Sequence, residues 1–401
     1  MNSIASPLIQ TYWYLSDYKA KPLQGEKKCD VCIVGGGMAG LHAAHEFQKK
    51  GFSVILLEKN FCGSGASGKS SGFITPDSEL PLRKLIDVYG AEDGKKLWEF
   101  VGSGVDLIRQ TIHEYDFQCD YIVQDTCVVA KSNHAYKTHI QKEYQSRQEL
   151  GYVTQIYDAQ QMHQVLQSEH YYGAVRYPGS FGINTFQYCQ ELKNMLQQQG
   201  GPGASVEIYE DTPALSVGDH CIETPHGKVT ADKVVLCIDR FLPDFEQSAV
   251  ADTVASMQTF LMISEPLSDK QVQELFPGGS LMVWDTDILY TYYRLTSNNR
   301  LLLGGGSWFS LYDMREAFSN KHVRNQLLRY YKKHFPQLHI SFRYFWPGLT
   351  QKDILVVIVK RADLFSSWFS PFFHEKKTKN VFCYIHSTVI GLYTSRKVKK
   401  R

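Results

Sequence analysis

The glycines of residues 31–40, VCIVGGGMAG, have the spacing of a phosphate-binding loop. Gly35, Gly37 and Gly40 match the pattern G-x-G-x-x-G. Gly35 permits a tight turn, Gly37 leaves room for a pyrophosphate near the backbone, and Gly40 lets the next helix pack closely on the strand. The N-terminus of such a helix presents unpaired N–H groups and the positive end of its dipole, which attract phosphate. The chemistry expected at this loop is therefore dinucleotide binding.

The elements that must position this loop follow in the required order. Residues 29–34 form a short apolar run that is typical of a buried strand, and residues 38–50 have the spacing of an amphipathic helix. Residues 52–58 form a second apolar run, as expected for a parallel strand covered on both faces. It ends at Glu58, whose carboxylate can accept both hydroxyls of a ribose. This order favours a nucleotide-binding unit over a glycine-rich turn without a ligand.

A second stretch of small residues, 63–72, follows the acidic strand end directly. Every residue in it except Lys69 is Gly, Ala or Ser. Small residues there let the backbone pass close to a large ligand, and Ser67, Ser70 and Ser71 add hydroxyl groups. The loop N–H groups and Lys69 can contact phosphate. A second loop of this kind favours FAD over NAD, because FAD extends further along the same strand ends. An NAD(P)-dependent enzyme stays open as a less favoured alternative.

The segments GGGMAG, LLEKN and GSGASGKSSGF together resemble the FAD-dependent amine and amino-acid oxidases of the D-amino-acid oxidase/glycine oxidase superfamily. The branch similar to gamma-glutamylputrescine oxidase fits best. That family usually has G-A-S-G-R-N-G-G in the second loop, where this chain has Lys69 and Ser70 in place of the arginine and the asparagine. The motifs that carry the resemblance lie within residues 29–75, and looser matches continue to about residue 350.

The resemblance implies an FAD cofactor and the residues that hold it. No His or Cys stands in a recognisable flavin-attachment motif, so non-covalent binding is expected. The implied residues lie in the two loops, at the acidic strand end, and at one later position that passes the adenine. They are Gly35, Gly37, Met38, Ala39, Gly40, Glu58, Lys59, Gly65, Ala66, Ser67, Gly68, Lys69, Ser71, Gly72 and Ala214.

Residues 281–306 predict part of an antiparallel sheet. They alternate in polarity and contain a turn at SNN between two strands. Tyr290 and Tyr292 share one face of such a strand, whereas Tyr293 lies on the other. The resemblance implies a sheet that covers the flavin, so Tyr290, Tyr292 and Arg294 are candidates for lining the substrate site. Cross-strand packing and a surface ion pair are the alternative roles for these three residues.

The predicted fold class is α/β. A Rossmann-like FAD-binding domain with a parallel central sheet is combined with an α+β substrate domain that has a mainly antiparallel sheet. The FAD-binding domain is expected to be discontinuous and to comprise residues 28–85, 155–240 and 345–401. The substrate domain is expected to comprise residues 86–154 and 241–344.

Composition and motif content argue against several other functions. The chain has 43 Lys and Arg and 41 Asp and Glu residues, so it lacks the basic excess of a dedicated nucleic-acid binder. Nine irregularly spaced cysteines predict no disulfide framework and favour a reducing, cytoplasmic compartment. No segment has the roughly 20 apolar residues of a membrane-spanning helix, and no secretory signal is present. The absence of H-E-x-x-H, G-x-S-x-G and zinc-ligand clusters predicts neither a metal site nor a hydrolase.

The C-terminal part departs from the family pattern. After WPGL the family usually shows T-x-D-x-x-P, a strand, a glycine-rich loop and a long helix directed at the flavin. Here Asp353 is present, but a valine replaces the proline. Gly391 is followed by ten residues, too few for a long helix at about 1.5 Å per residue.

Two functions therefore stay open. The first is an active oxidase or dehydrogenase that oxidises the C–N bond of an amine or amino acid by hydride transfer to flavin N5, giving an imine. The second is a degenerate flavoprotein with little turnover and a binding role. The sequence indicates no catalytic residue, because the proposed reaction needs no obligate protein base. It selects neither the specific amine nor the electron acceptor, which is O₂ or another oxidant.

Overall fold

The computed structural model describes most of the chain, in two compact units. The described residues are 12–13, 21–77, 80–199, 204–218, 220–238, 255–287, 289–309, 321–352, 356–359, 381–385 and 390–394. The first unit comprises Met1–Leu15, Lys69–Gln187 and Ser256–Thr350, and the second comprises Ser16–Gly68, Tyr188–Ala255 and Gln351–Arg401. The assignment of one domain to FAD and the other to substrate stays a prediction.

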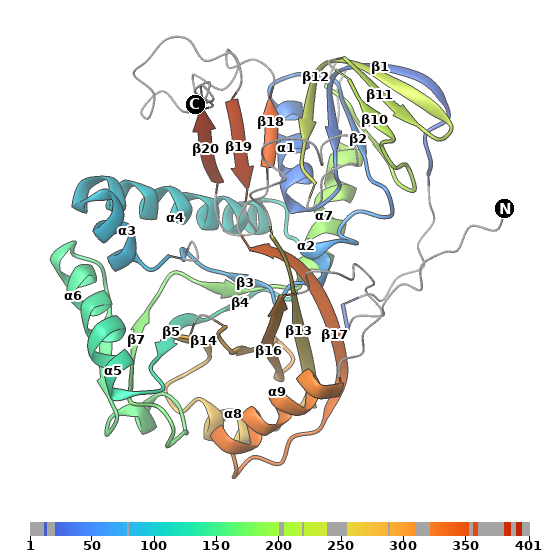
Figure 1. Cartoon of the computed structure of the whole chain (residues 1–401). Helices are drawn as coiled ribbons and strands as arrows, with labels where there is room; N and C mark the ends of the chain where they lie inside the picture. The colour runs from blue at the N-terminus through green and yellow to red at the C-terminus, as the bar shows by residue number, and fades with distance from the viewer. Residues whose placement is uncertain are drawn as a thin grey trace. The chain divides into compact units, whose positions relative to one another are not determined.

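The second unit contains a sheet with a parallel centre. Strands β12 (Gly227–Leu236), β1 (Gly25–Val34), β2 (Val54–Leu57) and β9 (Val206–Tyr209) pair in parallel in this order (Figure 1). Next to β12 lie three antiparallel strands, β18 (Val356–Val359), β19 (Val381–Ile385) and β20 (Ile390–Thr394). The predicted parallel central sheet is confirmed. Gly391 lies in β20, whereas Asp353 falls outside the described residues.

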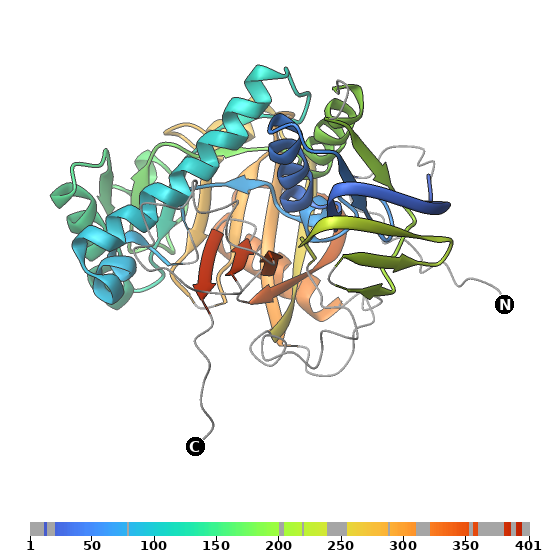
Figure 2. The same ribbon diagram turned by 90° about the horizontal axis from the view of Figure 1, so that it is seen from above.

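Helix α1 (Met38–Lys49) connects β1 to β2, as the sequence predicts. Its buried face includes Leu41, Ala44 and Phe47, which follow the expected helical spacing. Gly51 comes just after its end with φ = +84°, a conformation that glycine adopts without strain. Figures 1 and 2 show α1 on one face of the sheet and the hairpin of β10 (Ser216–Val217) and β11 (Cys221–Thr224) on the other.

The first unit is built on a mainly antiparallel sheet of eight strands among the described residues. Its order is β17 (Phe342–Lys352), β13 (Ala255–Pro266), β16 (Arg300–Phe309), β15 (Tyr292–Leu295), β14 (Leu281–Asp285), β5 (Asp125–Val129), β7 (Gly173–Tyr177) and β6 (Gln155–Asp158). Only β14 and β5 pair in parallel among the pairings described. The predicted hairpin is confirmed, because β15 and β16 pair across the SNN turn.

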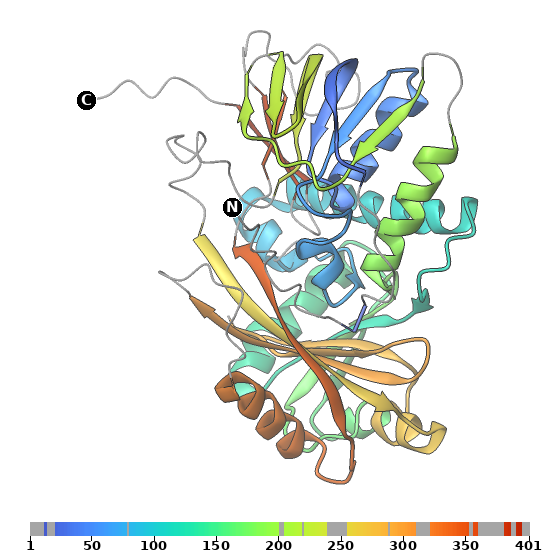
Figure 3. The same cartoon turned by 90° about the vertical axis from the view of Figure 1, so that its right-hand side faces the viewer.

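Helices cover one face of this sheet. Helices α8 (Asp269–Leu275) and α9 (Lys321–His334) lie beside it in Figure 3. Side chains of α9, such as Leu327, share a buried cluster with Phe260 and Tyr293 of the sheet. This cluster removes apolar surface from water and fixes which face of β15 points into the core.

A second group of helices packs around β7. Helices α3 (Leu82–Tyr89), α4 (Ala91–Glu114) and α6 (Gln141–Glu149) surround a cluster that contains Leu82, Trp98 and Tyr177. Apolar residues at three- and four-residue spacing predict a helical region over residues 80–115. It is interrupted at Gly90, where φ = +83° ends α3. Between α3 and α4 this turn lets the two helices pack against each other.

Short elements complete the described part of the chain. A three-stranded sheet has the order β3 (Phe73–Ile74), β8 (Phe181–Gly182) and β4 (Ile122–Val123). Helix α7 covers Thr185–Gln198, helix α2 covers Ala66–Lys69, helix α5 covers Asn133–Ala135, and single turns lie at Tyr136–Ile140 and Met162–Gln164. No helix among the described residues is both long and apolar enough to cross a bilayer.

Candidate functional site

The three glycines of the first loop lie close to other atoms, which are backbone atoms at Gly35 and Gly40 and a side-chain hydroxyl at Gly37. Gly35 has φ = +109°, and a Cβ atom there would overlap the carbonyl oxygen of Cys237. A Cβ atom at Gly40 would overlap the carbonyl oxygen of Gly35, and one at Gly37 would lie 2.9 Å from Ser67 Oγ. Each position therefore excludes a side chain, as a loop that lets a ligand approach its backbone requires.

The N-terminus of α1 opens at this loop without a capping side chain. Gly37 is the N-cap residue, and the first turn contains no acidic residue. The Met38 N–H donates to Ser67 Oγ at 3.1 Å, and the N–H groups of the first turn, which includes Ala39 and Gly40, have no intrahelical acceptor. The positive end of the helix dipole is thus left for an anion.

The second loop lies against the first within the second unit. The Gly63 N–H donates to the carbonyl oxygen of Gly36 at 2.9 Å, in addition to the bond between Met38 and Ser67. Two small-residue segments thus meet beside α1, as the sequence predicts. Of the other predicted positions here, Gly65 is exposed, Ala66 is half-buried, and Gly68 is buried.

Glu58 is buried at the end of β2. Its Oε2 atom accepts the Gly36 N–H at 2.7 Å, and its Oε1 atom accepts the Asn60 N–H at 2.9 Å. Burial raises the pKa of Glu58, while these two N–H donors favour the charged form. An ionised carboxylate has further lone pairs for a ligand hydroxyl. The neighbouring Lys59 is exposed, and Ala214 is buried in the core of the second unit.

Residues 69–72 of the second loop belong to the first unit, where side chains donate hydrogen bonds to their backbone carbonyl groups. The indole N–H of Trp346 donates to the Lys69 carbonyl at 3.1 Å, and that of Trp13 donates to the Ser70 carbonyl at 3.1 Å. Ser70 Oγ lies 3.1 Å from Thr185 Oγ1. The sequence did not identify either indole as a loop contact. No local spacing connects them to residues 69 and 70.

The hydrogen-bond partners of Arg294 are backbone carbonyl groups. It is fully buried, so it forms no surface ion pair. Its Nε donates to the Ser71 carbonyl at 2.8 Å, its Nη2 to the Ile183 carbonyl at 2.7 Å, and its Nη1 to the Leu295 carbonyl at 2.9 Å. The guanidinium is therefore engaged by backbone carbonyl groups, and its place in the substrate site stays a prediction.

Tyr292 and Tyr293 lie on opposite faces of β15, as predicted, whereas Tyr290 precedes this strand. Tyr290 and Tyr292 are half-buried, and their ring centroids lie 5.8 Å apart. The Tyr292 ring also packs edge-on against Phe73, with the centroids 5.6 Å apart. Tyr293, in contrast, is fully buried, and its hydroxyl lies 3.1 Å from that of Tyr171. Tyr290, Tyr292 and Phe73 thus form an aromatic surface on the face opposite Tyr293.

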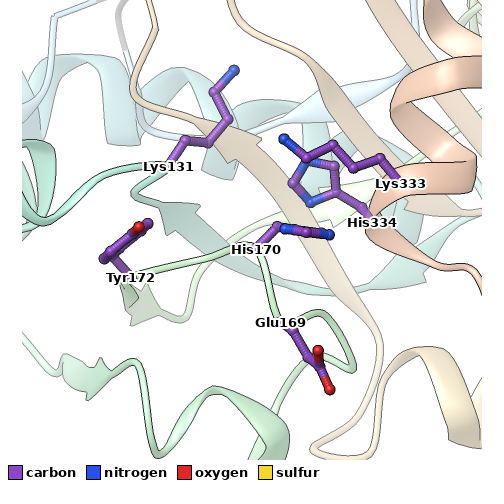
Figure 4. Close-up of a pocket in the computed structure, with 6 residues that line it drawn as sticks. All are labelled: Lys131, Glu169, His170, Tyr172, Lys333 and His334. Carbon is purple, nitrogen blue, oxygen red and sulfur yellow. The ribbon is translucent and has the colours of Figure 1, made fainter.

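A cavity of about 180 Å³ lies elsewhere in the first unit (Figure 4). It is lined by Lys131, Glu169, His170, Tyr172, Lys333 and His334, none of which is a predicted site residue. Lys131 forms ion pairs with Asp285 at 3.1 Å and with Asp287 at 2.5 Å, so its charge is already balanced. The Glu169 carboxylate points away from the two imidazoles in Figure 4. We assign this cavity no function.

Comparison with known proteins places the fold and the loops in one family. The family described as FAD dependent oxidoreductase matches residues 30–382. The probable oxidoreductase OrdL of Haemophilus influenzae is 29% identical over 310 residues, which cover 75% of this chain and 70% of that protein. The gamma-glutamylputrescine oxidoreductase of Escherichia coli is 29% identical over 325 residues, which cover 80% of this chain and 73% of that protein.

Solved structures agree at the level of the fold. Glycine oxidase from Geobacillus kaustophilus superposes with a TM-score of 0.66 at 19% identity, covering 81% of this chain and 83% of that one. L-proline dehydrogenase from P. horikoshii gives a TM-score of 0.64 at 16% identity, covering 82% and 83%. The predicted fold class and the predicted type of enzyme are confirmed. The chain belongs to the family of FAD-dependent oxidoreductases.

Proposed function

We propose that this chain binds FAD without a covalent link and oxidises the C–N bond of an amine or amino acid. The observation that carries the proposal is the uncapped N-terminus of α1. It opens beside glycines whose Cβ atoms would fill the loop, and Glu58 lies in contact with that loop. This donor set suits a pyrophosphate and a ribose.

The residues present fit the cofactor in three ways. The N–H groups of Ala39 and Gly40 would hold the pyrophosphate, together with Gly35, Gly37 and Met38, whose own N–H donates to Ser67 Oγ. Glu58 would accept the ribose hydroxyls, because its carboxylate is fixed by Gly36 and Asn60. The remaining predicted positions would line the cofactor along the second loop and beside the adenine. They are Lys59, Gly65, Ala66, Ser67, Gly68, Lys69, Ser71, Gly72 and Ala214.

The chain's own part in the reaction is to bind and orient the amine. When bound, a flavin supplies a hydride acceptor at N5, which converts the amine to an imine that water hydrolyses. Tyr290 and Tyr292, with Phe73, would present an aromatic surface to the substrate. An apolar surrounding lowers the pKa of a bound amine and so favours the neutral form that can release hydride. The name of the Escherichia coli relative, gamma-glutamylputrescine oxidoreductase, supports an amine substrate.

Anaerobic reduction by a panel of amines and amino acids tests the reaction. We expect the purified protein to absorb near 450 nm and to bleach with at least one member of the panel. Exposure of the bleached protein to O₂ or to a quinone then identifies the electron acceptor. A protein that stays colourless when FAD is supplied contradicts the proposed cofactor.

The Gly37→Val variant tests the placement of the pyrophosphate. A side chain at this position would meet Ser67 Oγ and block the approach to the backbone. We expect loss of FAD binding, measured as flavin absorbance after gel filtration. Gly102→Val in α4 is the matched control, because nothing lies within 4 Å of a Cβ atom there. Full flavin occupancy in Gly37→Val refutes this placement.

The second candidate function is a flavoprotein with little turnover. The observation that favours it is the set of antiparallel strands β18, β19 and β20, because the resemblance implies a long helix in the C-terminal part. The panel experiment separates the two candidates. Flavin that binds but is bleached by no amine or amino acid supports the binding role.

A further inference from the structure

We propose that Arg294 is a positioning residue that fixes the backbone of the second loop for the cofactor. This inference rests on the proposed FAD binding and replaces the substrate-lining role predicted for Arg294. The N–H groups of Arg294 donate hydrogen bonds to three backbone carbonyl groups. They belong to Ser71 in the loop, to Ile183 just after β8, and to Leu295 in β15. One side chain therefore joins three segments that are far apart in the sequence.

The space around the guanidinium is shaped for it by two glycines. Gly72 has φ = +69°, and a Cβ atom there would lie 2.7 Å from Arg294 Nη2 and overlap the Ile183 carbonyl. A Cβ atom at Gly182 would overlap Arg294 Nη1. A side chain at either glycine would therefore displace the guanidinium of Arg294. The Ile183 N–H also donates to the Gly72 carbonyl at 3.1 Å, so loop and strand are joined directly beside the guanidinium.

The charge of Arg294 is balanced by carbonyl dipoles. Among the residues that the structure describes, no carboxylate forms an ion pair with it, and only Asp120 attracts it from a longer range. Burial lowers the pKa of Arg294 to about 10, so the guanidinium is still charged at neutral pH. Its planar fork donates in several fixed directions at once, which a lysine ammonium cannot reproduce. The three carbonyls are therefore held in one arrangement as long as the arginine is present.

The backbone carbonyl groups of residues 69–71 all accept hydrogen bonds from side chains. The carbonyl of Ser71 faces Arg294, and those of Lys69 and Ser70 face Trp346 and Trp13. Three successive carbonyls are thus bound by donors of the first unit. Fixing these oxygens also fixes the peptide planes between them, because the peptide unit is planar. Arg294 therefore sets the conformation of the loop that the cofactor would meet.

Hydrogen exchange and flavin binding together test this inference. The variants are Arg294→Met, which removes the N–H donors, and Arg294→Lys, which keeps the positive charge but lacks the planar guanidinium group. The matched control is Arg176→Met, because Arg176 also donates to a carbonyl and a carboxylate of the first unit, neither of which belongs to the second loop. We expect exchange at Gly72 and Ile183 to be at least tenfold faster in both Arg294 variants and unchanged in Arg176→Met. We also expect tenfold weaker FAD binding and an altered visible circular dichroism band of the bound flavin.

The outcomes separate this inference from the proposed function. Unchanged exchange at Gly72 and Ile183 in both Arg294 variants overturns it, as does faster exchange with unchanged FAD affinity and an unchanged flavin band. If Arg294→Met does not fold, Arg294→Lys decides by the same measurements. A wild-type protein that binds no FAD overturns the proposed function itself. A wild-type protein that binds FAD, with variants that bind it equally well, overturns only the role of Arg294.

Discussion

At the scale of single residues, glycine is required where two backbone segments meet. The Cβ position of Gly40 overlaps the carbonyl oxygen of Gly35, which cannot move without displacing the turn after β1. Gly104 in α4, in contrast, has nothing within 4 Å of its Cβ position. The same substitution should therefore have opposite effects at the two sites.

Gly40→Ala should destabilise the protein by several kcal/mol, because overlap in a packed region forces backbone shifts that cost roughly 1–3 kcal/mol or more. Gly104→Ala should stabilise it by about 0.5–1 kcal/mol, since alanine loses less backbone entropy in a helix. Urea unfolding followed by circular dichroism measures both. Equal effects at the two positions would show that Gly40 is not tightly packed.

At the scale of elements, the end of α9 carries a buried histidine. His334 is 3% exposed, and its ring stacks on Tyr171 and Tyr330 with centroid distances of 4.7 and 4.2 Å. Its Nδ1 atom lies 3.2 Å from Ser168 Oγ. Burial lowers the pKa of His334 to about 3, and His170 and two nearby lysines add to the effect. The fold thus keeps this imidazole neutral.

Because the pKa is depressed in the folded state, protons bind the unfolded chain more tightly. The stability that depends on neutral His334 is complete above its unfolded pKa of about 6.5 and is lost as the pH falls below that value. His334→Gln should remove this dependence, so the variant should lose about 2 kcal/mol less than wild type between pH 7 and pH 5. Urea unfolding at the two pH values measures it.

The exposed His139 provides the control for this experiment. His139→Gln should keep the pH dependence of the wild type, because it changes no buried ring. A His334→Gln variant with the full wild-type loss of stability would mean that this imidazole is protonated in the folded protein.

At the scale of the whole molecule, cofactor binding should be visible as stability. A ligand that binds only the folded state stabilises it by about 2.7 kcal/mol at a concentration 100 times its Kd. Added FAD should therefore raise the Tm of the wild-type apoprotein by several degrees, in a concentration-dependent way. Differential scanning calorimetry measures the shift. Gly37→Val should show no shift, and an equal shift in that variant would place FAD elsewhere.

Much of this architecture follows from local patterns. The spacing of Gly35, Gly37 and Gly40 predicts the turn and helix because it specifies which positions tolerate close backbone approach. Alternation over residues 281–306 predicts the β15–β16 hairpin and the opposite faces of Tyr292 and Tyr293, since successive strand side chains point in opposite directions. The interruption at Gly90 was not predicted, because apolar spacing continues across it.

The sequence by itself determined the glycine-rich loop, the helix and strands around it, and the family. Those features depend on neighbours within a few residues, where backbone geometry and side-chain period act directly. Only the tertiary structure decided what Arg294, Trp13 and Trp346 contact. Their partners in the second loop are 57 to 277 positions away in the chain. Such contacts depend on how whole elements pack, and no short-range pattern encodes them.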